Sequence, residues 1–228
     1  MRTPAAWLPL LLLPLTALGG PDRVNARDYA LPKPGMEGEP PLNEALRQRR
    51  SLREFAARPL ALGALSQLLW AAQGITAAGG RRTAPSAGAL YPLELHVVAG
   101  RVDGLPAGTY RYEPDGHTLT ATGKGELLAQ LSLLAYGQQW IAKAPAAVVI
   151  TGVYRRTTGK YGQRGIRYVH IEVGHAGQNL LLQAEALGLG ATVVGAFNDR
   201  GLARLLGLAE GERPLAVLPV GHPASRGE

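Results

Sequence analysis

Residues 82–98 constrain the fold of this chain more than any other stretch, because they join a turn of small residues directly to a strand. They read RTAPSAGALYPLELHVV. The side chains of residues 85–88 are too small to keep a flat ligand away from the backbone. Residues 93–99, rich in branched side chains, are typical of a buried strand. The stretch predicts a ligand-contacting turn at the start of a core strand, with an ordinary tight turn as the alternative.

The composition fits one folded domain. With 228 residues and 46% hydrophobic content, the chain can bury one substantial core or share a core with a partner subunit. Its net charge of +7 suits general solubility or an anionic ligand. Many arginines stand in turns rather than in a stripe with interleaved aromatic residues, which favours a local phosphate site over nucleic acid. There is no cysteine, so redox chemistry would need a bound cofactor.

The first residues are typical of an export signal. Arg2 precedes an apolar run over residues 5–18, and Ala17-Leu18-Gly19 is a small-x-small cleavage site, which predicts a signal peptide over 1–19. We therefore expect a periplasmic or extracellular protein. The run is too short for a stable membrane span. An uncleaved membrane anchor, or a misassigned start and a cytoplasmic protein, are the alternatives.

The rest of the chain is expected to form an arm, one domain and a tail. Residues 20–41 are rich in proline and glycine and predict a linker or surface arm, and the tail is expected over 224–228. Within 42–223, apolar periodicity predicts helices over 42–49, 62–73, 125–135, 166–187 and 202–206, and strands over 93–99, 109–112, 117–121, 146–153, 191–194 and 214–221. The order of these elements indicates an α+β sandwich of helices around one sheet.

Two details of this pattern bear on assembly and on the site. In the long helix, Ala176 and Gly177 are small enough to allow another helix to approach closely. Residues 155–162, between a buried strand and that helix, are expected to form a mobile polar loop.

A basic motif follows the first helix. Arg49-Arg50-Ser51-Leu52-Arg53 places three guanidinium groups and one hydroxyl within five residues, a set that can neutralise a phosphate dianion. A solvated basic helix end is the alternative. After a later helix, Gln138 offers a carboxamide that can both donate and accept a hydrogen bond.

Other site classes find no support in the sequence. His170 and His175 are five residues apart, which is not the His-Glu-x-x-His spacing that places two metal ligands on one helix face, so no metal site is expected. The chain has no Gly-x-Ser-x-Gly elbow and no dinucleotide fingerprint after a strand. Hydrolase and Rossmann-type functions are therefore not indicated.

Together these motifs resemble the FMN-binding elements of the nitroreductase superfamily, most closely its branch of SagB-type azoline dehydrogenases, over residues 42–223. The resemblance implies a nitroreductase-like FMN-binding α/β sandwich in a domain-exchanged homodimer, with the flavin at the dimer interface. Tyr91-Pro92 stands where many nitroreductases have Gln-Pro, a departure shared with the azoline branch. The residues matched to FMN contacts are Arg49, Arg50, Ser51, Arg53, Gln138, Val194, Gly195 and Ala196, the neighbouring subunit's Pro85, Ser86, Ala87 and Gly88, and either His222 or Arg226 near the C-terminus.

The same resemblance suggests a catalytic pair. Lys160-Tyr161 is similar to the Lys-Tyr element that azoline dehydrogenases use for proton removal, and an exposed basic loop is the alternative. The implied function is oxidation of a C–N bond in a small or peptide-derived heterocycle. Two other functions stay open: NAD(P)H-dependent reduction of nitro compounds or quinones, and a non-catalytic flavin-binding partner protein. Retention of the polar motif residues favours an enzyme.

Overall fold

The computed structural model describes residues 27–37 and 40–224. The expected signal peptide over 1–19, Arg226 and the rest of residues 225–228 lie outside this part of the chain. Within it, no helix is long and apolar enough to cross a membrane. The strands are β1 (Asp28–Ala30), β2 (Ile75–Ala77), β3 (Arg81–Arg82), β4 (Leu93–Ala99), β5 (Gly108–Glu113), β6 (Thr118–Lys124), β7 (Ala146–Val153), β8 (Gly190–Ala191) and β9 (Glu212–Gly221). The helices are α1 (Leu42–Gln48), α2 (Leu62–Gln73), the 3₁₀ turn η1 (Ala87–Ala89), α3 (Leu128–Leu134), α4 (Trp140–Lys143), α5 (Arg155–Tyr161), α6 (Arg164–Ala186) and α7 (Asp199–Leu206).

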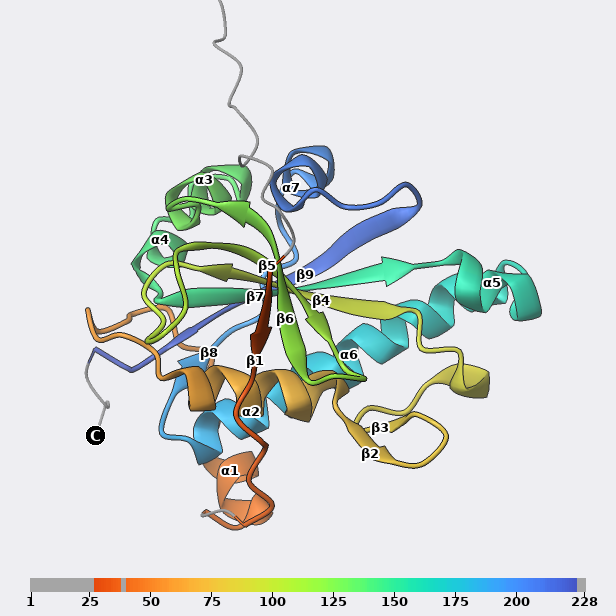
Figure 1. Ribbon diagram of the computed structural model, residues 1–228, viewed down its shortest axis with the longest axis horizontal. Coiled ribbons are helices and arrows are strands. Elements are labelled where there is room, and N and C mark those ends of the chain that lie inside the picture. The colour runs from red at the N-terminus through yellow and green to blue at the C-terminus, as the bar shows by residue number, and fades with distance from the viewer. Residues whose placement is uncertain (1–26, 38–39, 225–228) are drawn as a thin grey trace, which may run out of the picture.

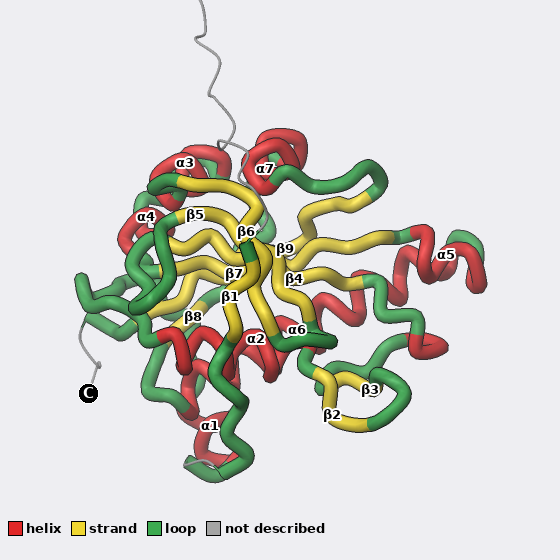
Figure 2. Tube along the Cα trace, in the orientation of Figure 1, coloured by secondary structure: helices red, strands yellow, loops and turns green. Residues whose placement is uncertain are grey.

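One antiparallel sheet organises the molecule, with its strands in the order β1-β6-β5-β4-β7-β9-β8 (Figure 1). Every residue of β4 and β7 is buried, since helices cover both faces of the sheet. Successive side chains alternate between two cores. Val97 belongs to the core with α2 and α6, whereas Val98 belongs to the core with α3, α4 and α7. Figure 2 shows α2 and α6 on one side of the sheet and α3, α4 and α7 on the other. The predicted α+β sandwich is confirmed.

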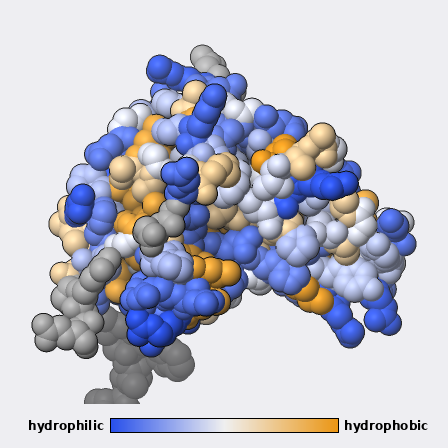
Figure 3. All heavy atoms as spheres, turned by 90° about the horizontal axis from the view of Figure 1, so that it is seen from below, coloured by the Kyte–Doolittle hydropathy of each residue, from blue (hydrophilic) through white to orange (hydrophobic). Residues whose placement is uncertain are grey.

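The long helix α6 corrects one expectation about assembly. Ala176 and Gly177 are buried against the chain's own sheet, where a Cβ on Gly177 would lie 3.9 Å from Ile150 and Leu218. Gly177 faces the sheet, and Ala176 belongs to the buried core that α6 shares with the sheet and α2, so neither residue is exposed to a partner subunit. The outward face instead carries Ile171, which is 48% exposed, and Gly174, which has open space around it. Figure 3 shows other apolar side chains that reach the surface among hydrophilic ones.

The expected loop at residues 155–162 is wrong, because residues 155–161 form the helix α5. The carbonyl of Tyr154 accepts the amide N–H groups of Thr157 and Thr158, which starts the helix. Gly162, in the left-handed region at φ 55°, ends it. About two turns of mostly polar residues have no apolar periodicity, so the sequence pattern contained no helical indication.

Three smaller differences concern element ends. The predicted strand over 191–194 is only Gly190–Ala191, although Val194 still pairs with Val217 as an isolated bridge. The predicted helix over 125–135 begins at Leu128, after Gly125 at φ 111°. Within the proline-rich segment 20–41, Asp28–Ala30 forms the edge strand β1 by pairing with β6. Backbone pairing with a partner strand determines the two strand ends, and local composition does not indicate such pairing.

A buried polar group ties β9 to its neighbours. The His96 ring lies 2.7 Å from a Glu212 carboxylate oxygen, which also accepts the Thr151 hydroxyl, and both the His96 and Glu212 side chains are almost fully buried. Burial alone would raise the pKa of Glu212. The hydrogen bonds from His96 and Thr151 and the nearby Arg111 charge outweigh burial and lower the pKa of this carboxyl.

Because the pKa of Glu212 is lower in the folded chain, its ionised form stabilises the fold above the unfolded pKa, and this stabilisation is lost as the pH falls through the folded pKa. Glu212→Gln should therefore lower the free energy of unfolding at pH 7 by about 1–3 kcal/mol. The difference from the wild type should shrink in acid. Urea denaturation over a pH series measures it, with exposed Glu210→Gln as the matched control. An equal loss at every pH would contradict the assignment.

Candidate functional site

The segment after α1 runs between the ends of two strands. Helix α1 stops at Arg49, whose backbone turns to φ −49°, ψ 124°. The amide of Leu52 then donates to the carbonyl of Ala191 at 3.1 Å, and the amide of Ala56 donates to the carbonyl of His222 at 2.9 Å. These bonds bring the basic motif, β8 and the end of β9 together, although they are far apart in sequence.

Gln138 and the turn after β8 meet the same segment. The Arg53 guanidinium lies 5.8 Å from the centroid of the Trp140 ring, just after Gln138 in sequence. The Gln138 amide donates to the carbonyls of Ala135 at 2.9 Å and Ala196 at 3.4 Å. This group of predicted residues is named the arginine cluster: Arg49, Ser51, Arg53, Gln138, Val194, Gly195, Ala196 and His222.

The cations of the arginine cluster are available to an anion. Among the described residues, no carboxylate lies within 4 Å of the Arg49 or Arg53 guanidinium. Arg50 differs, because its Nη1 donates to the carbonyls of Arg47 and Arg49 at 2.9 Å and so caps α1. At Gly195, which is exposed, a Cβ would meet no heavy atom within 4 Å, so its backbone can be approached closely.

The small-residue turn before β4 is strained. Gly88 at φ 64°, Ala89 at φ 52° and Tyr91 at φ 44° all lie in the left-handed region, which costs free energy for the two non-glycine residues. Two bonds to Ser86 hold the turn: the amide of Ala89 donates to its carbonyl at 3.0 Å, and the amide of Tyr91 donates to its hydroxyl oxygen at 2.8 Å. Pro85, at the start of the turn, is exposed.

A buried carboxylate on α6 holds this turn in place by a hydrogen bond. The amide of Ala87 donates to Glu172 Oε1 at 2.9 Å, and Glu172 is only 4% exposed. Burial raises the pKa of Glu172, and hydrogen bonds from Ala87 and Ser86 offset part of that rise. Glu172 was not predicted as a site residue, because a single acid on a helix face has no distinctive sequence pattern.

The predicted pair Lys160 and Tyr161 packs against the same turn. A Cβ placed on Gly88 would lie 2.8 Å from the Tyr161 hydroxyl oxygen and 3.0 Å from Lys160 Nζ. Lys160 is exposed and Tyr161 half-buried. The turn, its carboxylate and the pair are named the turn cluster: Pro85, Ser86, Ala87, Gly88, Lys160, Tyr161 and Glu172.

An ion pair anchors α5, which carries the pair. Arg156 lies 2.5 Å from Glu94, a buried carboxylate at the start of β4, and also donates to the carbonyl of Tyr91 at 3.0 Å. Glu94 also pairs with Arg111 at 3.2 Å. These contacts tie α5 both to the sheet and to the strained turn. They were not predicted, because α5 itself was expected to be a loop.

The two clusters lie at opposite ends of the molecule. In Figure 1, α4 and β8 of the arginine cluster are at the left, and α5 of the turn cluster is at the right. Within one chain, the predicted residues therefore form two separate groups that do not contact each other.

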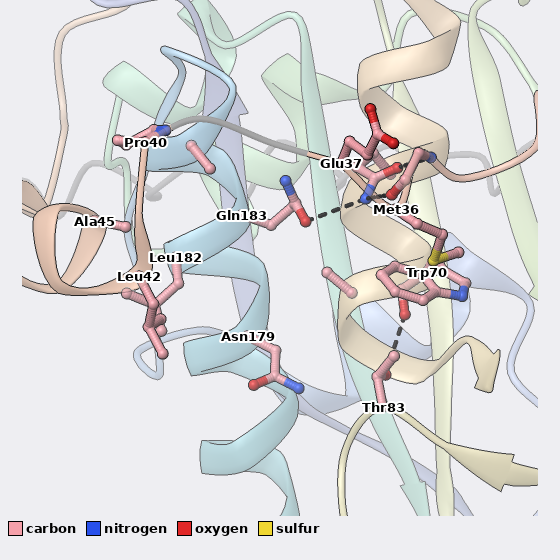
Figure 4. Close-up of a pocket in the computed structure, with 14 residues that line it drawn as sticks. Met36, Glu37, Pro40, Leu42, Ala45, Trp70, Thr83, Asn179, Leu182 and Gln183 are labelled. Carbon is pink, nitrogen blue, oxygen red and sulfur yellow. Dashed lines mark hydrogen bonds between the residues drawn. The ribbon is translucent and has the colours of Figure 1, made fainter.

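A pocket of about 400 Å³ lies apart from both sets, between α1, α2 and α6. The Trp70 ring and Leu182 contribute apolar walls, and a hydrogen bond of 3.2 Å joins the Gln67 and Gln183 amides across it (Figure 4). None of the predicted site residues lines this pocket.

Comparison with known proteins defines the class. Residues 46–222 match the model of the nitroreductase family. A protein of Methanocaldococcus jannaschii, whose name assigns it provisionally to the nitroreductases, is 45% identical over 79% of this chain and 90% of its own length. A solved structure from Ralstonia eutropha, with a similar provisional name, is 34% identical and has a TM-score of 0.77 over 88% of this chain and 91% of that chain. This chain belongs to the nitroreductase family.

A more distant relative is named for the processing of a microcin. The microcin B17-processing protein McbC of Escherichia coli is 31% identical over 56% of this chain. This chain covers only 49% of that protein. The family membership and the nitroreductase-like fold are therefore confirmed, and the activity within the family is taken up below.

The contact between Gly88 and Tyr161 can be measured. Gly88→Ala should lower the free energy of unfolding by about 1–2 kcal/mol for the left-handed backbone, plus about 1–3 kcal/mol for the crowded contact. Gly79→Ala is the matched control, since Gly79 has φ 79° but open space around it. Adding Tyr161→Phe should recover part of the excess loss at Gly88, as followed by urea denaturation. Equal losses in the two glycine variants would contradict the contact.

Proposed function

We propose that this protein is an FMN-dependent oxidoreductase that oxidises a C–N bond in a small or peptide-derived heterocycle. The observation that carries the proposal is the turn cluster, in which the missing side chain of Gly88 leaves room for the polar ends of Lys160 and Tyr161 to lie side by side. The family membership supports oxidoreductase chemistry. Similarity to McbC, over part of each chain, supports the azoline dehydrogenase branch.

The residues of the arginine cluster fit the flavin. Unpaired Arg49 and Arg53 with the Ser51 hydroxyl suit the phosphate and an electron-rich ring edge, because charge-assisted bonds to arginine are strong. The Gln138 amide suits a ring that presents both donors and acceptors. The open backbone at Gly195 would allow close approach. FMN, when bound, supplies two-electron hydride chemistry that no side chain of this chain can provide.

A homodimer would unite the two clusters. The arginine cluster and the turn cluster lie at opposite ends of one chain, so a single copy offers only half of each expected site. In a dimer, the turn cluster of one subunit would approach the arginine cluster of its partner. The exposed face of α6 around Gly174 is available for such an interface.

Within this site, Lys160 and Tyr161 would handle the proton. Azoline oxidation removes a proton from carbon while hydride leaves from the neighbouring position. Lys160 Nζ lies 5.4 Å from the centroid of the Tyr161 ring, and both polar ends meet over Gly88. Lys160 is exposed in the single chain. Desolvation by substrate or by the partner subunit would favour its neutral, proton-accepting form.

The second candidate is NAD(P)H-dependent reduction of nitro compounds or quinones. The provisional nitroreductase names of the Methanocaldococcus and Ralstonia proteins favour it. This reaction needs the same flavin contacts but no side-chain base. The pair Lys160–Tyr161 therefore separates the two functions.

Flavin binding tests the class of enzyme. The purified protein should be yellow, and Arg49→Ala should weaken FMN binding by about 1.5–3 kcal/mol, since a charge-assisted phosphate contact is lost. Titration of the apoprotein, followed by quenching of FMN fluorescence, measures this. Arg47→Ala is the matched control, because Arg47 is already paired with Glu44 at 2.8 Å. A colourless protein that takes up no FMN would contradict the proposal. If light scattering showed a monomer with FMN bound, the part of the proposal in which two subunits share the site would be contradicted.

The reaction is tested with a thiazoline-containing peptide and an electron acceptor. Mass spectrometry should show loss of two hydrogens as the azole forms. Lys160→Ala and Tyr161→Phe should each slow this roughly hundredfold or more, as expected when a proton-transfer group is removed. Their visible spectra and dimer content should match those of the wild type. Nitro or quinone reduction by NAD(P)H without azole formation would favour the second candidate.

A further inference from the structure

The region around α5 is strongly and uniformly basic. Residues 155–167 contain five basic side chains and no acidic one. Arg156 is neutralised by Glu94. The remaining four are exposed, and among the described residues none has a carboxylate within 4 Å: Arg155, Lys160, Arg164 and Arg167. Arg164 and Arg167 are three residues apart on α6, where like charges repel each other and an anion between them would relieve the repulsion.

A hollow opens beside these cations. Its volume is about 740 Å³, and it is lined by Gln163, Arg164, Ile166, Arg167, His170 and Ile171. Ile166 is 38% exposed and Ile171 48% exposed. The hollow thus offers cationic and apolar contacts within the size range of small-molecule sites. Figure 3 shows hydrophilic side chains protruding at the right-hand end, where α5 lies in Figure 1.

The hollow continues to the candidate catalytic pair. The Tyr161 ring packs edge-on against Tyr168, with 5.1 Å between centroids. Arg164 is four residues before Tyr168 on α6, so the two lie on the same face of the helix. The positive surface and the turn cluster therefore form one continuous region.

We propose that this region selects a small substrate with an acidic group, such as a carboxylate, on an apolar ring. Arg164 and Arg167 attract and hold the acidic group, while Ile166 and Ile171 contact the ring. The inference rests on the proposed function, because it concerns how a substrate reaches the flavin site. It applies to either candidate reaction, since both need a ring-bearing substrate beside Lys160 and Tyr161.

Two matched probes test the selection: 4-nitrobenzoate, which is anionic, and 4-nitrobenzyl alcohol, which is neutral. One measurement is equilibrium binding to the oxidised protein, followed by perturbation of its visible spectrum. The other is the rate at which each probe reoxidises the reduced protein, during which the nitro group takes up two electrons and two protons to give a nitroso group and water. The variant is Arg164→Gln with Arg167→Gln. Its control is Lys33→Gln with Lys124→Gln, which removes the same charge from exposed positions away from α5.

The wild type should prefer nitrobenzoate in both measurements. In the arginine variant this preference should fall on the order of tenfold, within the range that electrostatic steering gives. It should also fall in the wild type as salt is raised. The lysine control should keep the preference. Equal binding of the two probes by the wild type, or an equal fall in the control, would overturn the inference. Failure of both probes to reoxidise a flavin-loaded protein would instead count against the proposed function.

Discussion

The hydrogen bond between the buried Glu172 carboxylate and the amide of Ala87 is the contact on which the turn cluster depends. The turn it holds contains left-handed Ala89 and Tyr91, which the chain would not adopt without support. Glu172 lies on α6, the helix packed along the sheet, so the turn takes its position from the core. A carboxylate that accepts a backbone N–H is also a strong acceptor, which offsets part of the cost of burying it.

Rigidity at this turn has a direct consequence for the pair on α5. Gly88 leaves space for the Tyr161 hydroxyl and Lys160 Nζ, and Arg156 links the start of α5 to the same turn through the carbonyl of Tyr91. Under the proposed function Lys160 and Tyr161 act on one substrate, and the helix that carries both is anchored by neighbours that do not themselves react. Preorganisation of this kind lowers the entropy that a reaction must otherwise overcome.

The sequence predicted the elements whose residues are buried on both faces and failed where tertiary contacts decide. The bounds of α2, β4 and β7 agree with the expectation because their apolar runs are long and ended by clear breakers. Helix α5 was missed, since seven polar residues carry no periodicity and its anchor, Glu94, lies far away in sequence. Ala176 and Gly177 were assigned to an outer face, although helical spacing alone cannot say which neighbour a small residue meets. The family resemblance had assigned residues 85–88 to the neighbouring subunit, and the sheet order now gives the physical reason why they lie far from Arg49 within one chain.

That division places a requirement on any function of this chain. In the proposed site the arginine cluster would contact the phosphate and one side of the flavin ring, whereas α5 of the turn cluster lies at the other end of the molecule from α4 and β8 (Figure 1). Bending the sheet to join them would break the continuous core between α2, β4 and α6, at a cost far above the free energy of one binding event. In the proposed homodimer, association of two copies would bring the two clusters together without deforming either chain. Under the proposed function, dimerisation is therefore the least costly route to a complete site.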